Sequence, residues 1–330
     1  MVRTFIIVIV LAAGMLGAGL YHWTRTPITD GGAVVPFAIE AGSGIAQSAD
    51  QIAQAGVPVN PILFTLFARA SGRGHKIKAG SYELKPDTTP QRLLDQLVRG
   101  EFAQESLAVI EGWTFRQMRL AINAHTGLKH DTAQLSEREL LEKLKLDYPA
   151  AEGLFFPDTY LFAKGSSDLH VYRQAHQLLK KRLDDAWAAR DPALPYKTPY
   201  DALIMASIVE KETGAKADRP MIAGVFINRL KRGMLLQTDP TVIYGVGDKY
   251  DGKIYKRDLE TDTPFNTYTR VGLPPTPIAL PGVAALHAAL APARTDALYF
   301  VARGDGSSEF SGTLLEHNRA VQKYLRGRGN

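Results

Sequence analysis

The sequence of 330 residues contains no cysteine. This absence excludes disulfide bonds, zinc sites with cysteine ligands and catalysis by a thiol. A chain without thiols suits an oxidising compartment, where unpaired cysteines would form wrong bonds. Many cytosolic proteins also lack cysteine, so the observation only favours such a location.

Dense positive charge is absent as well. The chain has 39 Lys and Arg against 34 Asp and Glu, which gives a net charge of +5 spread along its length. Nucleic-acid binding is therefore not expected. The eight histidines are dispersed without a His-Glu-x-x-His pattern, and no nucleophile elbow, Walker loop or dinucleotide fingerprint occurs. We predict no metal site, no cofactor and no serine hydrolase.

The N-terminus carries the longest apolar run, from Phe5 to Trp23, between Arg3 and Arg25. At about 1.5 Å of rise per residue, a helix of this length just spans a hydrocarbon core of about 30 Å. The alternative is a cleaved signal peptide, because small residues for a cleavage site lie in the same run. We predict a retained transmembrane anchor at 5–23, after a cytoplasmic N-terminus at 1–4 and before a linker at 24–35. The flanking charges do not set its orientation.

A small α/β module is predicted for residues 36–105. Val34 to Ile39 has the pattern of a strand, a Gly-Ser-Gly turn leads into a helix, and Pro61 begins a second helix. A strand then follows at 78–84, and a last helix begins at Thr89-Pro90. This strand-helix-helix-strand order resembles LysM, the common carbohydrate-binding unit of cell-wall proteins.

The rest of the chain is predicted to be a connecting segment at 106–150 and a mainly helical domain at 151–330. The connecting segment has a strand pattern at 107–110. Helices are expected at 115–125, 136–144, 168–190, 200–213, 219–232, 282–290 and 316–326. Between Gly233 and Pro281 glycine and proline are dense, so we expect loops and short strands there. Substrate-contacting residues usually lie in such loops.

Glu212 is the strongest catalytic candidate. At about 100° per residue on a helix, Ile204 and Ile208 lie on one apolar face, and Glu212 follows on the same face. A carboxyl partly withdrawn from water has a raised pKa and can act as a general acid near neutral pH. Glu210 is expected to stay in water, ionised and facing Lys211 or Arg219. The alternative is that Glu212 is a helix-end residue that turns to solvent.

Five further residues are candidates for binding sugar, because carboxylates, amides and aromatic rings suit sugar hydroxyls and flat sugar faces. Each also has an ordinary interpretation as part of a satisfied turn. They recur mainly in one loop-rich region, which favours a shared site. They are Glu152, Gln237, Asp239, Asn266 and Tyr268.

Several motifs together closely resemble the endolytic murein transglycosylase family that is called MltG or YceG-like. They are Ala206-Ser-Ile-Val-Glu-Lys-Glu-Thr213, Val225-Phe-Ile-Asn-Arg-Leu230, Leu236-Gln-Thr-Asp-Pro-Thr-Val-Ile-Tyr-Gly245, Asn266-Thr-Tyr268, Gly272-Leu-Pro-Pro275 and His317-Asn318. The resemblance covers nearly the whole chain, and its motifs occur in the family's order.

The resemblance implies an α+β chain with a transmembrane helix, a LysM-like module and a mainly helical, lysozyme-like catalytic domain with loop-rich insertions. It implies a lytic transglycosylase, a carbon–oxygen lyase that ends glycan strands during peptidoglycan synthesis. It also implies that Glu212 is catalytic, that the anchor lies in the inner membrane with the catalytic part in the periplasm, and that the partners are glycan-polymerising synthases such as penicillin-binding proteins.

We expect Glu212 to protonate the glycosidic oxygen and then to accept the proton of the muramic acid C6 hydroxyl, which closes onto C1. This route needs no second carboxylate, unlike most glycoside hydrolysis. Two alternatives remain. One is a hydrolytic muramidase that uses Asp239 or Glu152 as second carboxylate, and the other is a wall-binding scaffold without activity. On the transglycosylase interpretation, Glu212→Gln abolishes turnover and Glu210→Gln is far milder.

Overall fold

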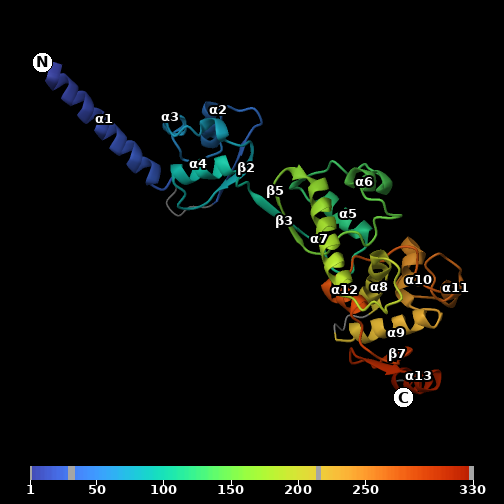
Figure 1. The fold of residues 1–330 in the computed structure, drawn as a ribbon. Coiled ribbons are helices and arrows are strands. Elements are labelled where there is room, and N and C mark those ends of the chain that lie inside the picture. The colour runs from blue at the N-terminus through green and yellow to red at the C-terminus, as the bar shows by residue number, and fades with distance from the viewer. Residues whose placement is uncertain (1, 29–33, 213–216, 327–330) are drawn as a thin grey trace. The chain divides into compact units, whose positions relative to one another are not determined.

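The computed structural model describes residues 2–28, 34–212 and 217–326 (Figure 1). The chain forms two compact units. The first comprises residues 1–106 with the short segments 127–129 and 161–166, and the second comprises residues 107–126, 130–160 and 167–330. Both contain helices and strands, so the chain is a mixed α and β protein.

Helix α1 (Val2–Arg25) contains the segment predicted as a transmembrane anchor. Within the described part of the chain, no helix is long and apolar enough to cross a membrane. The structure therefore does not support the transmembrane helix expected at 5–23. Part of the expected linker, residues 29–33, lies outside the described residues.

The first unit has the predicted strand-helix-helix-strand order. It contains β1 (Val35–Ile39), α2 (Ile45–Gln54), α3 (Pro61–Ala70), the 3-10 turn η1 (Gly74–Lys76), β2 (Gly80–Leu84) and α4 (Pro90–Arg99). Strands β1 and β2 pair antiparallel, with Phe37 opposite Tyr82. Turn residues begin two of the helices, since the side chain of Asn60 caps α3 and that of Thr89 caps α4.

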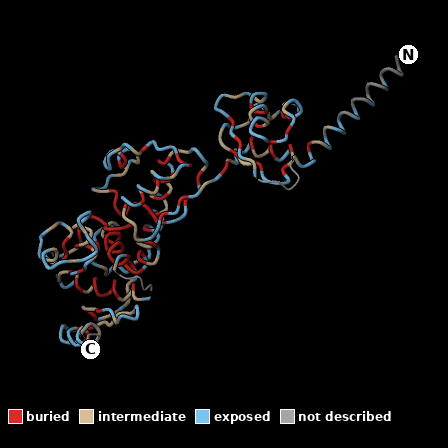
Figure 2. Tube along the Cα trace, turned by 180° about the vertical axis from the view of Figure 1, so that it is seen from behind, coloured by how far each residue is buried: buried red, intermediate tan, exposed pale blue. Residues whose placement is uncertain are grey.

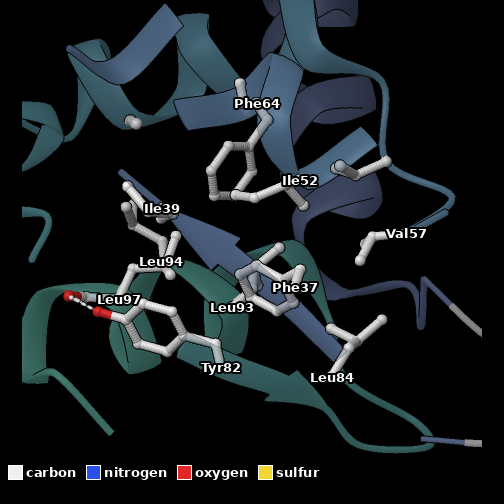
Figure 3. Close-up of a cluster of buried hydrophobic side chains, with 13 residues drawn as sticks. Phe37, Ile39, Ile52, Val57, Phe64, Tyr82, Leu84, Leu93, Leu94 and Leu97 are labelled. Carbon is white, nitrogen blue, oxygen red and sulfur yellow. Dashed lines mark hydrogen bonds between the residues drawn. The ribbon is translucent and has the colours of Figure 1, made fainter. Parts of the chain in front are cut away.

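The core of this unit lies between the two-stranded sheet and its helices (Figure 3). Leu93, Leu94 and Leu97 form the buried face of α4, while Ile52 of α2 and Phe64 of α3 pack into the same cluster. The apolar spacing on α4 is the one that the sequence predicts. Burying these side chains is what stabilises so small a unit.

The second unit is mainly helical. Its helices are α5 (Phe115–Ala124), α6 (Glu137–Leu144), α7 (Asp168–Ala188), α8 (Pro199–Glu212), α9 (Arg219–Lys231), α10 (Asp239–Val246), η2 (Gly247–Lys249), α11 (Lys256–Glu260), α12 (Val283–Leu290), α13 (Leu314–Val321) and the π-turn η3 (Gln322–Arg326). Strands β7 (Tyr299–Ala302) and β8 (Ser308–Ser311) of this unit pair antiparallel.

The remaining short strands lie where the chain passes from one unit to the other. Strand β3 (Gln104–Ala108) pairs with β5 (Thr159–Ala163), and β4 (Leu128–Lys129) pairs with β6 (Ser166–Ser167).

Helix α8 is the central helix of the second unit. It packs against α7, α9, α10 and α12, and every residue from 202 to 210 is buried (Figure 2). A helix that is covered on all sides has no solvent face. Residue 213, with which the sequence ended this helix, lies outside the described residues.

The expectation of loops and short strands between residues 233 and 281 is wrong in part. The described residues of this region form no strand, but they form helices α10 and α11. Pro240 stands in the first turn of α10, where proline favours a helix start because its missing N–H would have no partner there.

Candidate active site

Glu212 is the last residue of α8 and is half-buried. The hydroxyl of Thr238 donates a hydrogen bond of 2.5 Å to Glu212 Oε2. Burial raises the pKa of Glu212, and the negative charge of Asp239 raises it further, while the hydrogen bond from Thr238 opposes them. The carboxyl therefore holds its proton to higher pH than an exposed glutamate does.

Glu212 lies in the wall of a cavity of about 420 Å³. This size suits one or a few sugar rings rather than a long polymer. The lining combines carboxyl, amide, guanidinium and aromatic groups from α8, α9, residues 236–239 at the start of α10, the loop that carries Tyr268, strand β7 and helix α13. The lining residues are Glu212, Arg229, Leu236, Gln237, Asp239, Tyr268, Tyr299, Phe300, Leu314, His317 and Asn318.

The segment from Leu236 to Asp239 is held in an unusual conformation. Gln237 has φ +52°, in the left-handed region that non-glycine residues seldom occupy. The backbone N–H of Gln237 donates to Thr267 O at 3.0 Å, and the backbone N–H of Thr238 donates to Thr267 Oγ1 at 3.1 Å. Thr267 thus fixes the backbone that brings Thr238 to the carboxyl of Glu212. Local strain that neighbouring contacts maintain is typical of functional sites.

Asp239 and Tyr268 form a second polar pair in the cavity. Tyr268 Oη donates to Asp239 Oδ1 at 2.6 Å. Burial raises the pKa of Tyr268, and the hydrogen bond to Asp239 adds to this effect. The phenol therefore stays protonated at neutral pH and serves as a donor and as a flat surface, both of which suit sugar recognition.

The C-terminal segment supplies the other wall. Tyr299 lies on β7 and His317 on α13, and their rings stack with centroids 5.2 Å apart. Burial lowers the pKa of His317, so this ring is neutral at neutral pH. Its Nδ1 is buried and has no hydrogen-bond partner in the described part of the chain.

Two of the six predicted site residues do not line the cavity. Asn266 is only 1% exposed, and its side-chain amide donates to the carbonyls of residues 258, 259 and 261. Its oxygen accepts from the amide of Tyr268 at 2.8 Å. Asn266 therefore shapes the loop that carries Tyr268, and its hydrogen-bonding groups are already used.

Glu152 is the second residue outside the cavity lining, and it is 5% exposed. It accepts hydrogen bonds from the amide of Phe115 at 2.9 Å and from Tyr244 Oη at 3.2 Å. Burial raises the pKa of Glu152 to about 7. Its contacts connect the start of α5 with α10, so its surroundings are those of a buried structural carboxyl.

Glu210 is buried, so its expected exposure to water is wrong. Its carboxylate pairs with Arg219 at 2.8 Å and accepts from the amide of Gly282 at 2.9 Å. The expected partner Arg219 is correct. The helical-face argument failed for Glu210 because neighbouring helices surround α8, so a polar residue on the side opposite Glu212 still contacts protein.

Other residues that line the cavity or contact Glu212 were not selected as site residues from the sequence. Thr238 and Arg229 lie inside motifs that the sequence displays, so the motifs were the available signal. His317 and Asn318 were also noted only as a motif. For Tyr299, Phe300 and Leu314 no local signal existed, because the C-terminal segment reaches the cavity through tertiary packing.

The arrangement offers one carboxyl that is suited to give and take a proton, beside donors and aromatic rings. Ser207 takes no part, because its hydroxyl donates to Ile204 O and accepts from the amide of Ile278. The cavity therefore fits acid–base chemistry on a polar substrate.

The model of the family described as YceG-like matches residues 37–323. The chain is 33% identical over 314 residues to a Bacillus subtilis (strain 168) protein named endolytic murein transglycosylase, an alignment that covers 90% of this chain and 86% of that protein. A Streptococcus pneumoniae protein of the same name is 26% identical over all of this chain, which spans 66% of that relative. A crystal structure of a yceG-like protein from Listeria monocytogenes superposes with a TM-score of 0.56 at 31% identity, over 87% of this chain and 99% of that one.

Proposed function

Because the chain belongs to the YceG-like family, we propose that it is an endolytic murein transglycosylase that uses Glu212 as its acid and base. The observation that carries the catalytic assignment is the half-buried carboxyl of Glu212, with a raised pKa, in a cavity of sugar-sized dimensions. The substrate is the glycan strand of peptidoglycan. The cleaved bond joins N-acetylmuramic acid to N-acetylglucosamine.

The reaction begins when protonated Glu212 donates its proton to the glycosidic oxygen, and the bond from that oxygen to C1 of muramic acid breaks. The resulting carboxylate accepts the proton of the C6 hydroxyl, whose oxygen bonds to C1. The products are a 1,6-anhydro end and a free hydroxyl on the departing sugar. Glu212 is protonated again, so one carboxyl completes the cycle.

Neighbouring residues serve this cycle in different ways. Thr238 orients the carboxyl of Glu212 through its hydrogen bond. Gln237, Asp239 and Tyr268 line the same cavity and offer donors and acceptors to sugar hydroxyls. Glu152 and Asn266 act through structure, because neither lines the cavity.

Product analysis by mass spectrometry tests this proposal. Uncrosslinked glycan strands are digested with the wild-type protein and with Glu212→Gln, and their new ends are identified. Anhydro ends are expected from the wild type, and a loss of at least about 100-fold in rate is expected for the variant, because general acid–base catalysis contributes that much or more. Far-UV circular dichroism checks that the variant is folded.

The same digestion distinguishes the hydrolytic alternative. Asp239 lies in the cavity with Glu212, which is the observation that favours a second carboxylate. Hydrolysis adds water and leaves reducing ends in place of anhydro ends. Reducing ends alone would overturn the transglycosylase chemistry. Unchanged strands with the wild type would favour a wall-binding scaffold.

We also propose, from the sequence resemblance, a periplasmic location at the inner membrane, LysM-like glycan binding by the first unit, and glycan-polymerising synthases as partners. Cell fractionation tests the location. A pull-down with insoluble peptidoglycan tests glycan binding. Crosslinking in cells, followed by identification of the synthases bound to this chain, tests the proposed partners.

A further inference from the structure

Arg229 of α9 lines the cavity and places a positively charged guanidinium in its wall. The residue is 8% exposed. Its Nε donates to Leu298 O at 2.7 Å, and its Nη1 donates to the carbonyls of Leu235 and Leu236 and to Gln237 Oε1, at 3.0 to 3.2 Å. All four acceptors are uncharged. Nη2 has no acceptor within the described residues.

Hydrogen bonds to uncharged acceptors compensate this burial only in part, because no opposite charge among the residues that the structure describes pairs with the guanidinium. Taking a guanidinium out of water costs several kcal/mol, by general estimates, unless an opposite charge or strong hydrogen bonds replace the water. Arg219 on the same helix is buried to a similar degree and pairs with Glu210. By contrast, no carboxylate of the described chain lies within ion-pair distance of Arg229. Its guanidinium carbon lies 5.1 Å from the centroid of the Tyr299 ring, a cation–π contact.

The other titratable groups around the cavity do not neutralise Arg229. Glu212 tends to hold its proton, and His317 tends to stay neutral. Tyr268 remains a neutral phenol. Asp239 is the one remaining acid that lines the cavity, and its Oδ1 accepts the hydrogen bond from Tyr268. The cavity thus presents a cation that is held rigidly and has no carboxylate within ion-pair distance in the described part of the chain.

From this geometry we infer that Arg229 binds a carboxylate of the substrate, and that the catalytic cavity selects glycan strands that carry one. Arginine suits this role because its planar fork matches a carboxylate, and because it stays charged. The inference rests on the proposed function. It adds recognition of a negatively charged substrate group to a cavity whose other residues suit sugar hydroxyls and flat sugar faces.

Two sources supply such a group in peptidoglycan. The lactyl substituent of muramic acid ends in a carboxylate where no peptide is attached, and stem peptides carry their own carboxylates. The chemistry that Arg229 recognises is the same in both, so the test must separate them.

The experiment uses four substrates. Glycan strands with stem peptides and strands stripped of peptides are each prepared with free carboxylates and with carboxylates converted to amides. The initial rate of anhydro-end formation gives kcat/KM for each. For the wild type, amidation is expected to lower kcat/KM roughly tenfold in at least one pair, as the loss of a charge-assisted hydrogen bond implies. The affected pair identifies the source.

Arg229→Gln is the test variant, since an amide keeps some hydrogen bonds to the backbone carbonyls and removes the charge. It should cleave free and amidated strands equally. Arg232→Gln is the matched control, because Arg232 is exposed just beyond the end of α9 and does not line the cavity. The control should discriminate as the wild type does. Circular dichroism and thermal unfolding show whether each variant is folded.

Equal kcat/KM for free and amidated strands in both wild-type pairs would overturn the inference. The same conclusion would follow from a folded Arg229→Gln that still discriminates. The wild-type comparison needs no variant, so it can overturn the inference even if Arg229→Gln does not fold. Cleavage of none of the four substrates would contradict the proposed function itself, and the inference with it.

Discussion

Thr238 Oγ1 lies 2.5 Å from Glu212 Oε2, so the residue that precedes α10 holds the carboxyl at the end of α8. The hydrogen bond stabilises the charged carboxylate and lowers the pKa of Glu212, against the effect of burial. Thr238 is itself fixed by Thr267. The protonation of Glu212 therefore depends on a loop distant in sequence.

Thr238→Val should move the pH dependence of the reaction. Without the donated hydrogen bond the pKa of Glu212 rises, so the general acid keeps its proton to higher pH. The fall of kcat/KM on the alkaline side should then occur at higher pH than in the wild type. Thr238→Ser keeps the hydroxyl and should leave the profile in place. A profile of Thr238→Val that coincides with the wild type would contradict this relationship.

Glu210→Gln should destabilise the fold. Removing one partner of a buried ion pair leaves Arg219 uncompensated, which costs about 3–5 kcal/mol of unfolding free energy. Denaturation with urea measures this loss. The exposed pair of Lys181 and Asp185 provides a control, because Asp185→Asn should change stability by about 0.5 kcal/mol or less. Turnover per folded molecule should change little in Glu210→Gln.

Glu152 should make stability fall as pH rises. Its pKa is about 7 in the fold and near 4.5 in the unfolded chain, so the folded state holds the proton more tightly. The stabilisation is complete below about pH 4.5 and is lost as pH rises to about 7. Glu152→Gln removes this dependence, and its stability relative to the wild type should increase by up to about 3 kcal/mol between pH 4 and pH 8.

Urea denaturation at several pH values measures that difference. A constant difference across the range would show that Glu152 is not protonated in the fold near neutral pH. Loss of turnover in a folded Glu152→Gln would instead favour the hydrolytic alternative, in which this carboxyl takes part in the chemistry.

Tyr268→Phe and Asn266→Ala should have different effects. The first removes one hydrogen bond in the cavity and should lower kcat/KM roughly threefold to tenfold with normal stability. The second leaves buried carbonyls of the loop without their donor and should lower the free energy of unfolding by about 1–3 kcal/mol. Kinetics and thermal unfolding of both variants check the distinction. A stable Asn266→Ala with a raised KM would return Asn266 to the sugar-binding residues.

The sequence predicted local structure well where apolar spacing and caps agree. The strand before Ile39, the helix that begins after Thr89 and the helix that ends near Glu212 all occur as expected. It failed for α10, although Pro240 marks a helix start, because the dense glycine and proline of that region suggested only loops.

The sequence predicted several site residues that lie in short motifs, but not those whose position depends on tertiary packing. Glu212, Gln237, Asp239 and Tyr268 belong to short motifs, and the structure brings them together. Glu210 could not be judged from helical spacing, because its burial depends on what covers the far side of α8. The same holds for Tyr299, whose place in the cavity is set by packing over a separation of some 90 residues from Glu212.

The C-terminal residues that line one side of the cavity limit how this chain can be shortened or tagged. A shortened version that stops before Tyr299 would retain Glu212 and Thr238, yet it would lack five of the eleven residues that line the cavity. On the proposed mechanism, water would then reach C1 of the muramic acid and would compete there with the C6 hydroxyl of the same sugar. On that mechanism the C-terminal segment influences which product forms, so an affinity tag at the C-terminus needs the same control measurements as a substitution beside Glu212.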